Sequence, residues 1–489
     1  CYNRNNIRRS SKLMPTTKLQ FTEWLPDQPS NAGSLNDAKN VFPVSVGYSP
    51  FPNAVDFSGA ASENLNSVYA AKFGSEVVIF GGATTKIFKF NAATEALEDK
   101  SLIGGYSGAS NWRFTLFGAE VLGVNGTAKV QRWTIGSSTA FADLAAAAPT
   151  AEFITTVRDF VVCANIGSDA NKVQWSDIND ATDWTPGTTS QSDYQIMPDG
   201  GNITGITGGE FGIVFLEKAV ARMSYTGSPL FFQFDTISRG LGCIAGGSIA
   251  QYGGLSFFLS DDGFYQTDGQ SVTGIGNEKV DNYFFNDVSL VDIDSMSSSA
   301  DPKRKIVVWN YANNSGGRSI IIYNWQLGKW SRADTTSTVV GDIATSGTTL
   351  EALTSTLGYS DIDTMPASLD ARLWVGGKFL FAGALSDKIA TFTGSDYNSE
   401  LITTDMEVGY NSVITLARPQ VDNGSANVSI ASRRELDDAV VFGPESITSS
   451  EGRADLRSAG RYHRLSVKPT GNWTTAMAVD VDIKPQGNR

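Results

Sequence analysis

The residues of this chain that could do chemistry are few and widely spaced. The 489 residues include one histidine, His463, and three cysteines, Cys1, Cys163 and Cys243. A hydrolytic triad needs a histidine beside an activated nucleophile, and no Gly-x-Ser-x-Gly elbow accompanies His463. A structural zinc site needs four clustered ligands, mostly His or Cys, which this sequence lacks. We therefore expect no enzyme activity, no catalytic, metal-binding or cofactor-binding residue, and no cofactor.

Paired carboxylates keep a propeller glycosidase among the alternatives. Asp180 and Asp183 lie close together, and Asp261 and Asp262 precede a glycine. Two carboxylates can hydrolyse a glycosidic bond, but Asp and Gly between strands more often form turns. Cys163 lies in the apolar run Phe160–Ala164, which indicates a buried small hydrophobic side chain.

The composition is typical of many short strands joined by polar turns. Charged residues make up 18% of the chain, below the roughly 25% of an average globular protein, and glycine is abundant. The net charge is −13, almost all of it before residue 418, since residues 418–489 hold 10 basic and 9 acidic residues. An acidic chain does not bind the phosphate groups of a nucleic acid tightly. No apolar run approaches the ~18 residues of a membrane span, so we expect no membrane contact.

Seven pairs of apolar runs recur along the chain. The first runs begin near residues 77, 121, 160, 213, 257, 306 and 379, and an aromatic-ending second run follows each. Most spacings fall near the ~40–50 residues of a propeller blade. We predict an all-β fold with a β-propeller-like core of six or seven small antiparallel sheets, each first run being the inner strand. A series of β-sandwiches is the alternative.

Three regions follow from this pattern. Residues 1–60 read as an extended N-terminal arm broken by prolines, and Met14-Pro15 is a candidate native start that would leave residues 1–13 outside. Residues 61–400 form the propeller-like domain, with an insertion near 340–368. Residues 401–489 alternate apolar and polar side chains and predict a C-terminal antiparallel β domain.

Several segments resemble a family of podovirus virion proteins. The segments Phe21–Asn53, Val173–Gly187 and Gly240–Gly269, together with RSAGRYHRLSVKP near the C-terminus, resemble the tail hub or nozzle family, which includes proteins named for stabilising packaged DNA. The resemblance implies a structural protein of the virion tail. It implies a homo-oligomeric ring, usually hexameric, that forms the DNA exit conduit and contacts the genome only transiently and without sequence specificity.

The partners implied by this resemblance are the adaptor proteins of the head–tail connector and the tail fibres, spikes or needle. We expect assembly interfaces in the arm and in the C-terminal domain, with candidate residues Trp24, Leu25, Phe42, Arg461, His463 and Arg464. A glycan-binding protein of host recognition is a further alternative, in which Trp112, Trp175 and Trp184 would stack on sugars.

Overall fold

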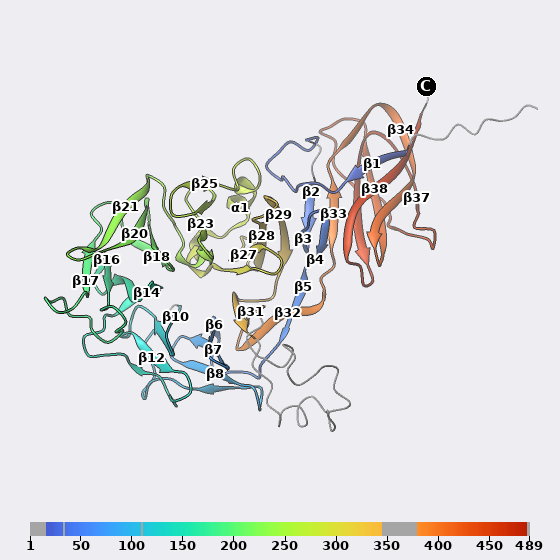
Figure 1. The fold of residues 1–489 in the computed structure, drawn as a ribbon. Coiled ribbons are helices and arrows are strands. Elements are labelled where there is room, and N and C mark those ends of the chain that lie inside the picture. The colour runs from blue at the N-terminus through green and yellow to red at the C-terminus, as the bar shows by residue number, and fades with distance from the viewer. Residues whose placement is uncertain (1–15, 33–34, 109–110, 345–378, 487–489) are drawn as a thin grey trace, which may run out of the picture. The chain divides into compact units, whose positions relative to one another are not determined.

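The structure is a computed structural model that describes residues 16–32, 35–108, 111–344 and 379–486 (Figure 1). The chain divides into two compact units. One unit holds residues 52–328 and 333–395, and the other holds residues up to 51, 329–332 and those from 396 onward. The proposed native start, residues 1–13 and most of the predicted insertion near 340–368 lie outside the described residues. Residues 340–344 of that insertion are a strand, because they lie in β30 (Val339–Ala344).

The first unit is a β-propeller built from small antiparallel sheets. Six sheets have four strands each, and β26, β27 and β28 take a seventh position. The sheets are, in chain order, β6 (Leu65–Phe73), β7 (Glu76–Ala83), β8 (Ile87–Asn91) and β9 (Ala96–Asp99); β10 (Arg113–Phe117), β11 (Glu120–Val124), β12 (Gln131–Thr134) and β13 (Ala142–Asp143); β14 (Ala151–Val157), β15 (Phe160–Ile166), β16 (Asp169–Trp175) and β17 (Asp193–Ile196); β18 (Ile203–Thr207), β19 (Gly212–Leu216), β20 (Ala219–Gly227) and β21 (Phe231–Arg239); β22 (Ala250–Tyr252), β23 (Leu255–Leu259), β24 (Phe264–Thr267) and β25 (Val272–Gly274); β26 (Ser297–Asp301), β27 (Ile306–Ala312) and β28 (Arg318–Asn324); and β30, β31 (Phe379–Leu385), β32 (Lys388–Asp396) and β5 (Pro52–Asp56).

The first strands of the sheets form a closed ring. Contacts run from β6 through β10 and β14 to β18, and from β22 through β26 and β30 back to β6. Thr207 of β18 and Ser256 of β23 join the fourth and fifth sheets by a hydrogen bond of 3.2 Å. The prediction of six or seven sheets arranged radially is therefore confirmed.

The apolar cores lie between successive sheets. Phe80, Trp112 and Trp133 pack between the first two sheets, and Phe215 and Phe258 between the fourth and fifth. All seven predicted apolar runs are strands, but they are the second strand of each sheet. The prediction that they are the inner strands was wrong. A second strand is covered by neighbouring strands on both edges and by neighbouring sheets on both faces, so it is the most apolar one.

Strand β5 closes the ring from the N-terminal side of the chain. It pairs with β32 and completes the last sheet. Around this junction Phe57 N–H donates to the Ile389 carbonyl at 2.8 Å, and Lys388 pairs with Asp56 at 2.6 Å. The two ends of the propeller sequence are thus held in one sheet by hydrogen bonds.

Helical structure is sparse in the described residues. It consists of α1 (Asp281–Asp287) and two short 3₁₀ turns, η1 (Gly246–Ser248) and η2 (Leu290–Ser295). Within the described ranges, no helix has the length and apolar character needed to cross a membrane.

The second unit joins the two ends of the chain in one mixed sheet. The sheet contains β1 (Thr16–Gln20), β2 (Leu35–Lys39), β3 (Val41–Pro43), β4 (Tyr48–Pro50), β33 (Glu400–Thr403), β34 (Met406–Asp422), β35 (Ser425–Arg433), β36 (Ser446–Ile447), β37 (Ala454–Thr470) and β38 (Thr475–Pro485), while β29 (Lys329–Asp334) is divided between the units. Strand β1 pairs with β38, and β2 pairs with β33. The described part of the predicted arm therefore lies against its own chain, because β1 and β2 pair with C-terminal strands.

The close approach of β5 and β32 yields a test of ring closure. A Cβ atom on Gly394 would lie 2.6 Å from Val55 Cγ1 and 3.0 Å from the Asn53 carbonyl oxygen. We expect Gly394→Ala to lower the free energy of unfolding by about 1–3 kcal/mol through overpacking, measured by urea denaturation. Gly254→Ala is the matched control, because a Cβ there meets open space. Equal stability of the two variants would contradict the closure described here.

Candidate functional site

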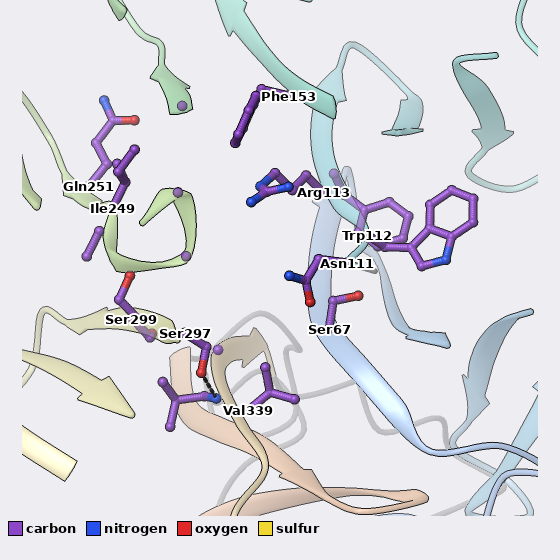
Figure 2. A pocket seen from close by; sticks show the side chains of 18 of the residues that line it. Ser67, Asn111, Trp112, Arg113, Phe153, Ile249, Gln251, Ser297, Ser299 and Val339 are labelled. Carbon is purple, nitrogen blue, oxygen red and sulfur yellow. Dashed lines mark hydrogen bonds between the residues drawn. The ribbon is translucent and has the colours of Figure 1, made fainter. Parts of the chain in front are cut away.

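The first strands of the propeller surround a central cavity of about 390 Å³. Strands β6, β10, β14, β18, β22, β26 and β30 all contribute lining residues (Figure 2). The lining is mixed, with polar side chains such as Ser67, Arg113 and Asp342 beside apolar ones such as Phe153 and Ile249. This cavity lies wholly within the propeller unit.

Among the described residues that line this cavity, Arg113 and Asp342 are the charged ones. The Arg113 guanidinium lies 4.2 Å from the centre of the Phe153 ring, and Nη1 donates to the Glu152 carbonyl at 3.3 Å. Burial lowers the pKa of Arg113, and the nearby Glu152 carboxylate opposes this effect. Arg113 remains a cation at any neutral pH, since its ordinary pKa is far above 7.

Asp342, on β30, is the acidic residue of the described lining. Its side chain is open to the cavity, yet protein surrounds it on most sides, and this burial raises the pKa of its carboxyl. The same enclosure raises the pKa of Tyr69, with a smaller contribution from the Asp342 charge. The protein around this part of the cavity thus disfavours negative charge.

Several hydroxyl groups at the cavity have no hydrogen-bond partner among the described residues. They belong to Ser67, Ser298 and Ser299, of which Ser299 is only 4% exposed. By contrast, Ser297 Oγ accepts a hydrogen bond from the Val340 N–H at 2.9 Å (Figure 2). A buried hydroxyl without a partner is unfavourable, and these three oxygens are enclosed by protein, so they do not face the open part of the cavity.

The carboxylates that suggested a glycosidase form turns at the surface. Asp180 Oδ1 accepts from the Thr182 N–H at 2.8 Å, and Asp183 Oδ1 accepts from the Thr185 N–H at 3.0 Å. Asp262 accepts from the Tyr265 hydroxyl at 2.8 Å. None of these carboxylates lines the central cavity.

The three tryptophans considered for sugar stacking are buried. Trp112, Trp175 and Trp184 are each at most 3% exposed. Their indole N–H groups donate to backbone carbonyls of Ala83, Gln191 and Ala181 at 2.7–2.9 Å. These rings fill the sheets and their junctions, so they lack the open ring face that the glycan-binding alternative requires of them.

The cysteines and possible metal ligands have structural surroundings. Cys163 is fully buried, as predicted, and burial raises the pKa of its thiol. Cys243 is also buried, and its Sγ donates to the Ala245 carbonyl at 3.2 Å. In the part of the chain that the structure describes, no group of three or more His, Cys, Asp or Glu side chains could hold a metal ion.

The predicted interface residues of the N-terminal segment lie against their own chain. Trp24 is 1% exposed, its backbone N–H donates to the Tyr48 hydroxyl, and its indole N–H donates to the Asn36 carbonyl at 3.2 Å. Leu25 and Phe42 are partly buried. Trp24 is therefore a core residue of the second unit and cannot serve as an interface residue in this conformation.

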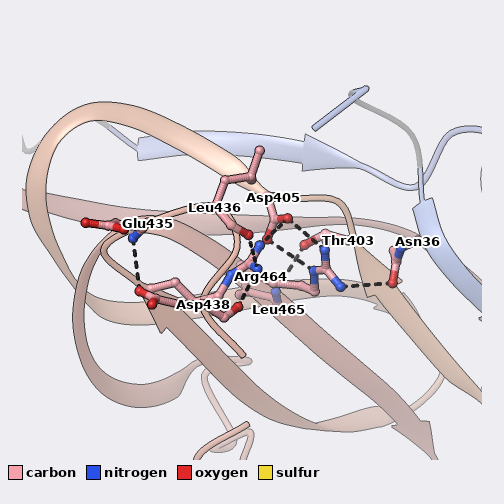
Figure 3. A network of polar contacts seen from close by, with 9 residues as sticks. Asn36, Thr403, Asp405, Glu435, Leu436, Asp438, Arg464 and Leu465 are labelled. Atoms are coloured by element: carbon pink, nitrogen blue, oxygen red, sulfur yellow. Dashed lines mark hydrogen bonds and ion pairs between the residues drawn. The ribbon is translucent and has the colours of Figure 1, made fainter. Parts of the chain in front are cut away.

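Arg464 belongs to a buried ion-pair network instead of a surface (Figure 3). Asp405 Oδ2 lies 2.5 Å from Arg433 Nη2 and 2.7 Å from Arg464 Nη2, and the Asp405 side chain is fully enclosed. Arg464 Nη1 also donates to Asn36 Oδ1 at 3.1 Å, which ties β37 to β2. Arg464 was predicted at an interface. The structure corrects this, because the side chain is buried and its charge is paired with Asp405 of the same chain.

His463 is buried beside that network. Its Nε2 lies 2.7 Å from Ser412 Oγ, and its Nδ1 lies 2.7 Å from Ser432 Oγ. Burial lowers the pKa of His463 to about 4. His463 is thus an internal neutral residue and not an interface residue. Of the predicted interface residues Arg461, His463 and Arg464, only Arg461 is exposed. Its Nη2 lies 2.6 Å from Glu407 Oε1.

Comparison with known proteins leaves the family open. No protein-family model and no curated protein matches the sequence. Two solved structures are similar in fold at low identity. A chain of the mitotic checkpoint complex has 10% identity and a TM-score of 0.39, covering 70% of this chain and 93% of that chain. The WD40 domain of Neurospora crassa Pan2 has 8% identity and a TM-score of 0.37, covering 58% of this chain and 86% of that chain.

The β-propeller assignment rests on the sheet order and ring closure of the chain itself. Sequence reasoning did not single out Arg113, Asp342 or Ser299, which come together only at the ring axis. The one local signal was a charged residue between two aromatic ones, Trp112-Arg113-Phe114, at the start of β10.

The buried network predicts a strong effect of substituting Asp405. Burial raises the pKa of the Asp405 carboxyl, but hydrogen bonds from Arg464 and Arg433 outweigh this and hold it below its usual range. We expect Asp405→Asn to destabilise the protein by about 3–5 kcal/mol in urea unfolding at neutral pH, because two buried arginines lose their counter-ion. The control Glu407→Gln removes an exposed pair and should change stability by less than about 1 kcal/mol. Equal losses would contradict the buried network.

His463 predicts a pH dependence of stability. Its folded pKa is lowered to about 4, below the unfolded value of 6.5. The unfolded chain therefore binds a proton first, and stability should fall as pH drops from 6.5 towards 4, by up to about 1.4 kcal/mol per pH unit. Urea unfolding at pH 7, 6 and 5 measures this, with His463→Gln expected to show a smaller slope. An identical slope in the variant would show that other groups cause it.

Proposed function

We propose that this chain is a structural subunit of the tail nozzle, or hub, of a short-tailed bacteriophage, assembled as a homo-oligomeric ring in the virion. The assignment to a phage tail rests on the resemblance of Phe21–Asn53, Val173–Gly187 and Gly240–Gly269 to that family. In this structure the described residues of these segments form strands and turns of both units. Their role is then to build a rigid scaffold.

An exposed apolar edge in the C-terminal unit is the observation that carries the assembly proposal. We define this apolar edge as Leu436, Val440, Val441 and Ile447, which are 40%, 36%, 74% and 71% exposed. All four lie within residues 436–447, and exposed apolar side chains that combine into a patch mark protein–protein contact sites.

The apolar edge is held in place by hydrogen bonds. Arg433 Nη1 donates to the carbonyls of Leu436 and Asp438 at 2.6 and 2.8 Å. Gly443 N–H donates to the Ile430 carbonyl at 3.0 Å, and Ile447 lies in β36, which pairs with β35. A preorganised apolar surface loses little conformational entropy on association, which favours a stable subunit contact.

The charge of the chain suits a conduit for DNA. A net charge of −13 repels phosphate groups, so a genome would pass such a surface without being retained. This supports transient and non-specific contact with DNA, while adaptor proteins and tail fibres, spikes or a needle are the proposed neighbours. The hexameric state is proposed from the resemblance alone.

A glycan-binding role is the second candidate. Its proposed stacking residues Trp112, Trp175 and Trp184 are buried and hydrogen-bonded to backbone carbonyls. Since stacking needs an open ring face, these residues do not support that role, and we rank it behind the ring subunit.

The ring proposal predicts a defined assembly. Negative-stain images and light scattering of the purified full chain should show closed rings of one symmetry, and we expect six subunits. Val441→Asp should shift the protein to monomers, because it places a charge in the apolar edge. Ile103→Asp, at a position 97% exposed in the propeller unit, should leave the rings intact. A wild-type monomer under all conditions, or intact rings of Val441→Asp, would contradict the proposal.

A further inference from the structure

We propose that the apolar edge of one copy binds a pocket in the propeller unit of the next copy, so that one repeated contact between two different surfaces builds the ring. This inference rests on the ring-subunit proposal and names the partner surface of the apolar edge. A cyclic ring of more than two copies needs two different surfaces on each chain, because a surface that pairs with itself closes a two-fold dimer. The apolar edge therefore requires a complementary surface elsewhere on the same chain.

The pocket lies where the third sheet of the propeller leads into the fourth. Its volume is about 360 Å³, and it is formed by residues 197–201, by the turn at Lys218 and by the end of β21 at Arg239. Met197 and Ala219 line it and are each 6% exposed, so its wall offers apolar surface. An apolar cavity of about 150 Å³ holds a benzene-sized molecule. This pocket therefore has room for two aliphatic side chains.

The rim of the pocket is cationic in an acidic protein. Lys218 and Arg239 line the pocket, both are exposed, and neither forms an ion pair with a described residue. Asp199 is the acidic residue of the described lining, so two positive charges and one negative charge leave a net of +1, against −13 for the whole chain. Exposed cations beside an apolar wall favour an apolar segment that carries negative charge.

The backbone around the two cations is held by hydrogen bonds. The Lys218 N–H donates to the Gly200 carbonyl at 2.9 Å, and the Gly240 N–H donates to the Lys218 carbonyl at 2.8 Å. Gly200 has a φ of +99°, and a Cβ atom there would lie 2.7 Å from Ala219 Cβ. The pocket is therefore formed before association, which lowers the entropic cost of binding.

The apolar edge carries the complementary charge. Residues 434–441 are all exposed and hold one basic and three acidic residues, a net charge of −2: Arg434, Glu435, Asp437 and Asp438. Val440 and Val441 follow directly and are 36% and 74% exposed. Figure 3 shows the Glu435 side chain pointing away from the buried network around Asp405. The edge thus offers aliphatic side chains beside carboxylates, which matches the apolar wall and cationic rim of the pocket.

The test reverses the charge of each surface in the full chain, with light scattering and negative-stain images as readouts. One variant combines Lys218→Glu with Arg239→Glu, and the other combines Glu435→Lys with Asp437→Lys. We expect each variant alone to lose its rings, with the concentration for half-assembly rising at least about tenfold, because like charges then meet at every contact. An equal mixture of the two variants should form rings again, since each acidic surface then meets a basic one.

The controls separate this contact from misfolding and from other contacts. Circular dichroism checks that each variant is folded. Val291→Asp is the matched control, because Val291 is 94% exposed in the propeller unit beside the acidic residues Asp292 and Asp294, and this variant should keep its rings. Loss of rings in Val291→Asp would overturn the inference by making that segment the contact.

The outcomes also distinguish this inference from the ring proposal on which it rests. Rings that persist in the Lys218→Glu and Arg239→Glu variant, or a mixture that forms no rings, would overturn the pocket as the partner of the apolar edge while the ring proposal still stands. A wild-type chain that forms no rings would contradict the ring proposal, and this inference with it.

Discussion

The closure of the ring is the constraint on which the propeller depends. Each small sheet has two apolar faces, and only a neighbouring sheet on either side can remove both from water. A linear row of such sheets would leave two faces exposed at its ends. The last sheet covers the exposed face of the first, because its strand β30 packs beside β6. Strand β5 joins this last sheet by pairing with β32 and so fixes it to the start of the propeller sequence. One short strand from the N-terminal side therefore stabilises interfaces all around the ring.

Closure also determines what faces the axis. When the sheets meet radially, the first strands converge and their side chains surround a cavity of about 390 Å³. Polar and apolar side chains meet there, and Arg113 and Asp342 are the charged residues among the described lining. The bulky aromatic side chains lie further out, between sheets, where Phe80, Trp112 and Trp133 pack. The charged groups at the axis and the bulky aromatic groups at the sheet junctions are thus separated by this geometry.

The second unit holds together two parts of the chain that are distant in sequence. Strand β1 pairs with β38 and β2 with β33, so backbone hydrogen bonds link the N-terminal segment to the C-terminal strands. The buried network around Asp405 adds charge-assisted bonds, including Arg464 to Asn36. Such a network specifies one alignment of β2 and β37, because any shift would leave a buried charge unpaired.

The sequence by itself determined the local elements. All seven apolar runs and the alternating C-terminal segments form strands, because strand formation and burial follow from short-range side-chain patterns. Only the tertiary structure decided which strand is innermost, which strand closes the ring and which polar groups meet. Trp24, His463 and Arg464 are buried because of partners that are distant in sequence; Asn36 and Arg464 are 428 residues apart. The cavity likewise takes one strand from every sheet, and no local pattern records that such residues share an axis.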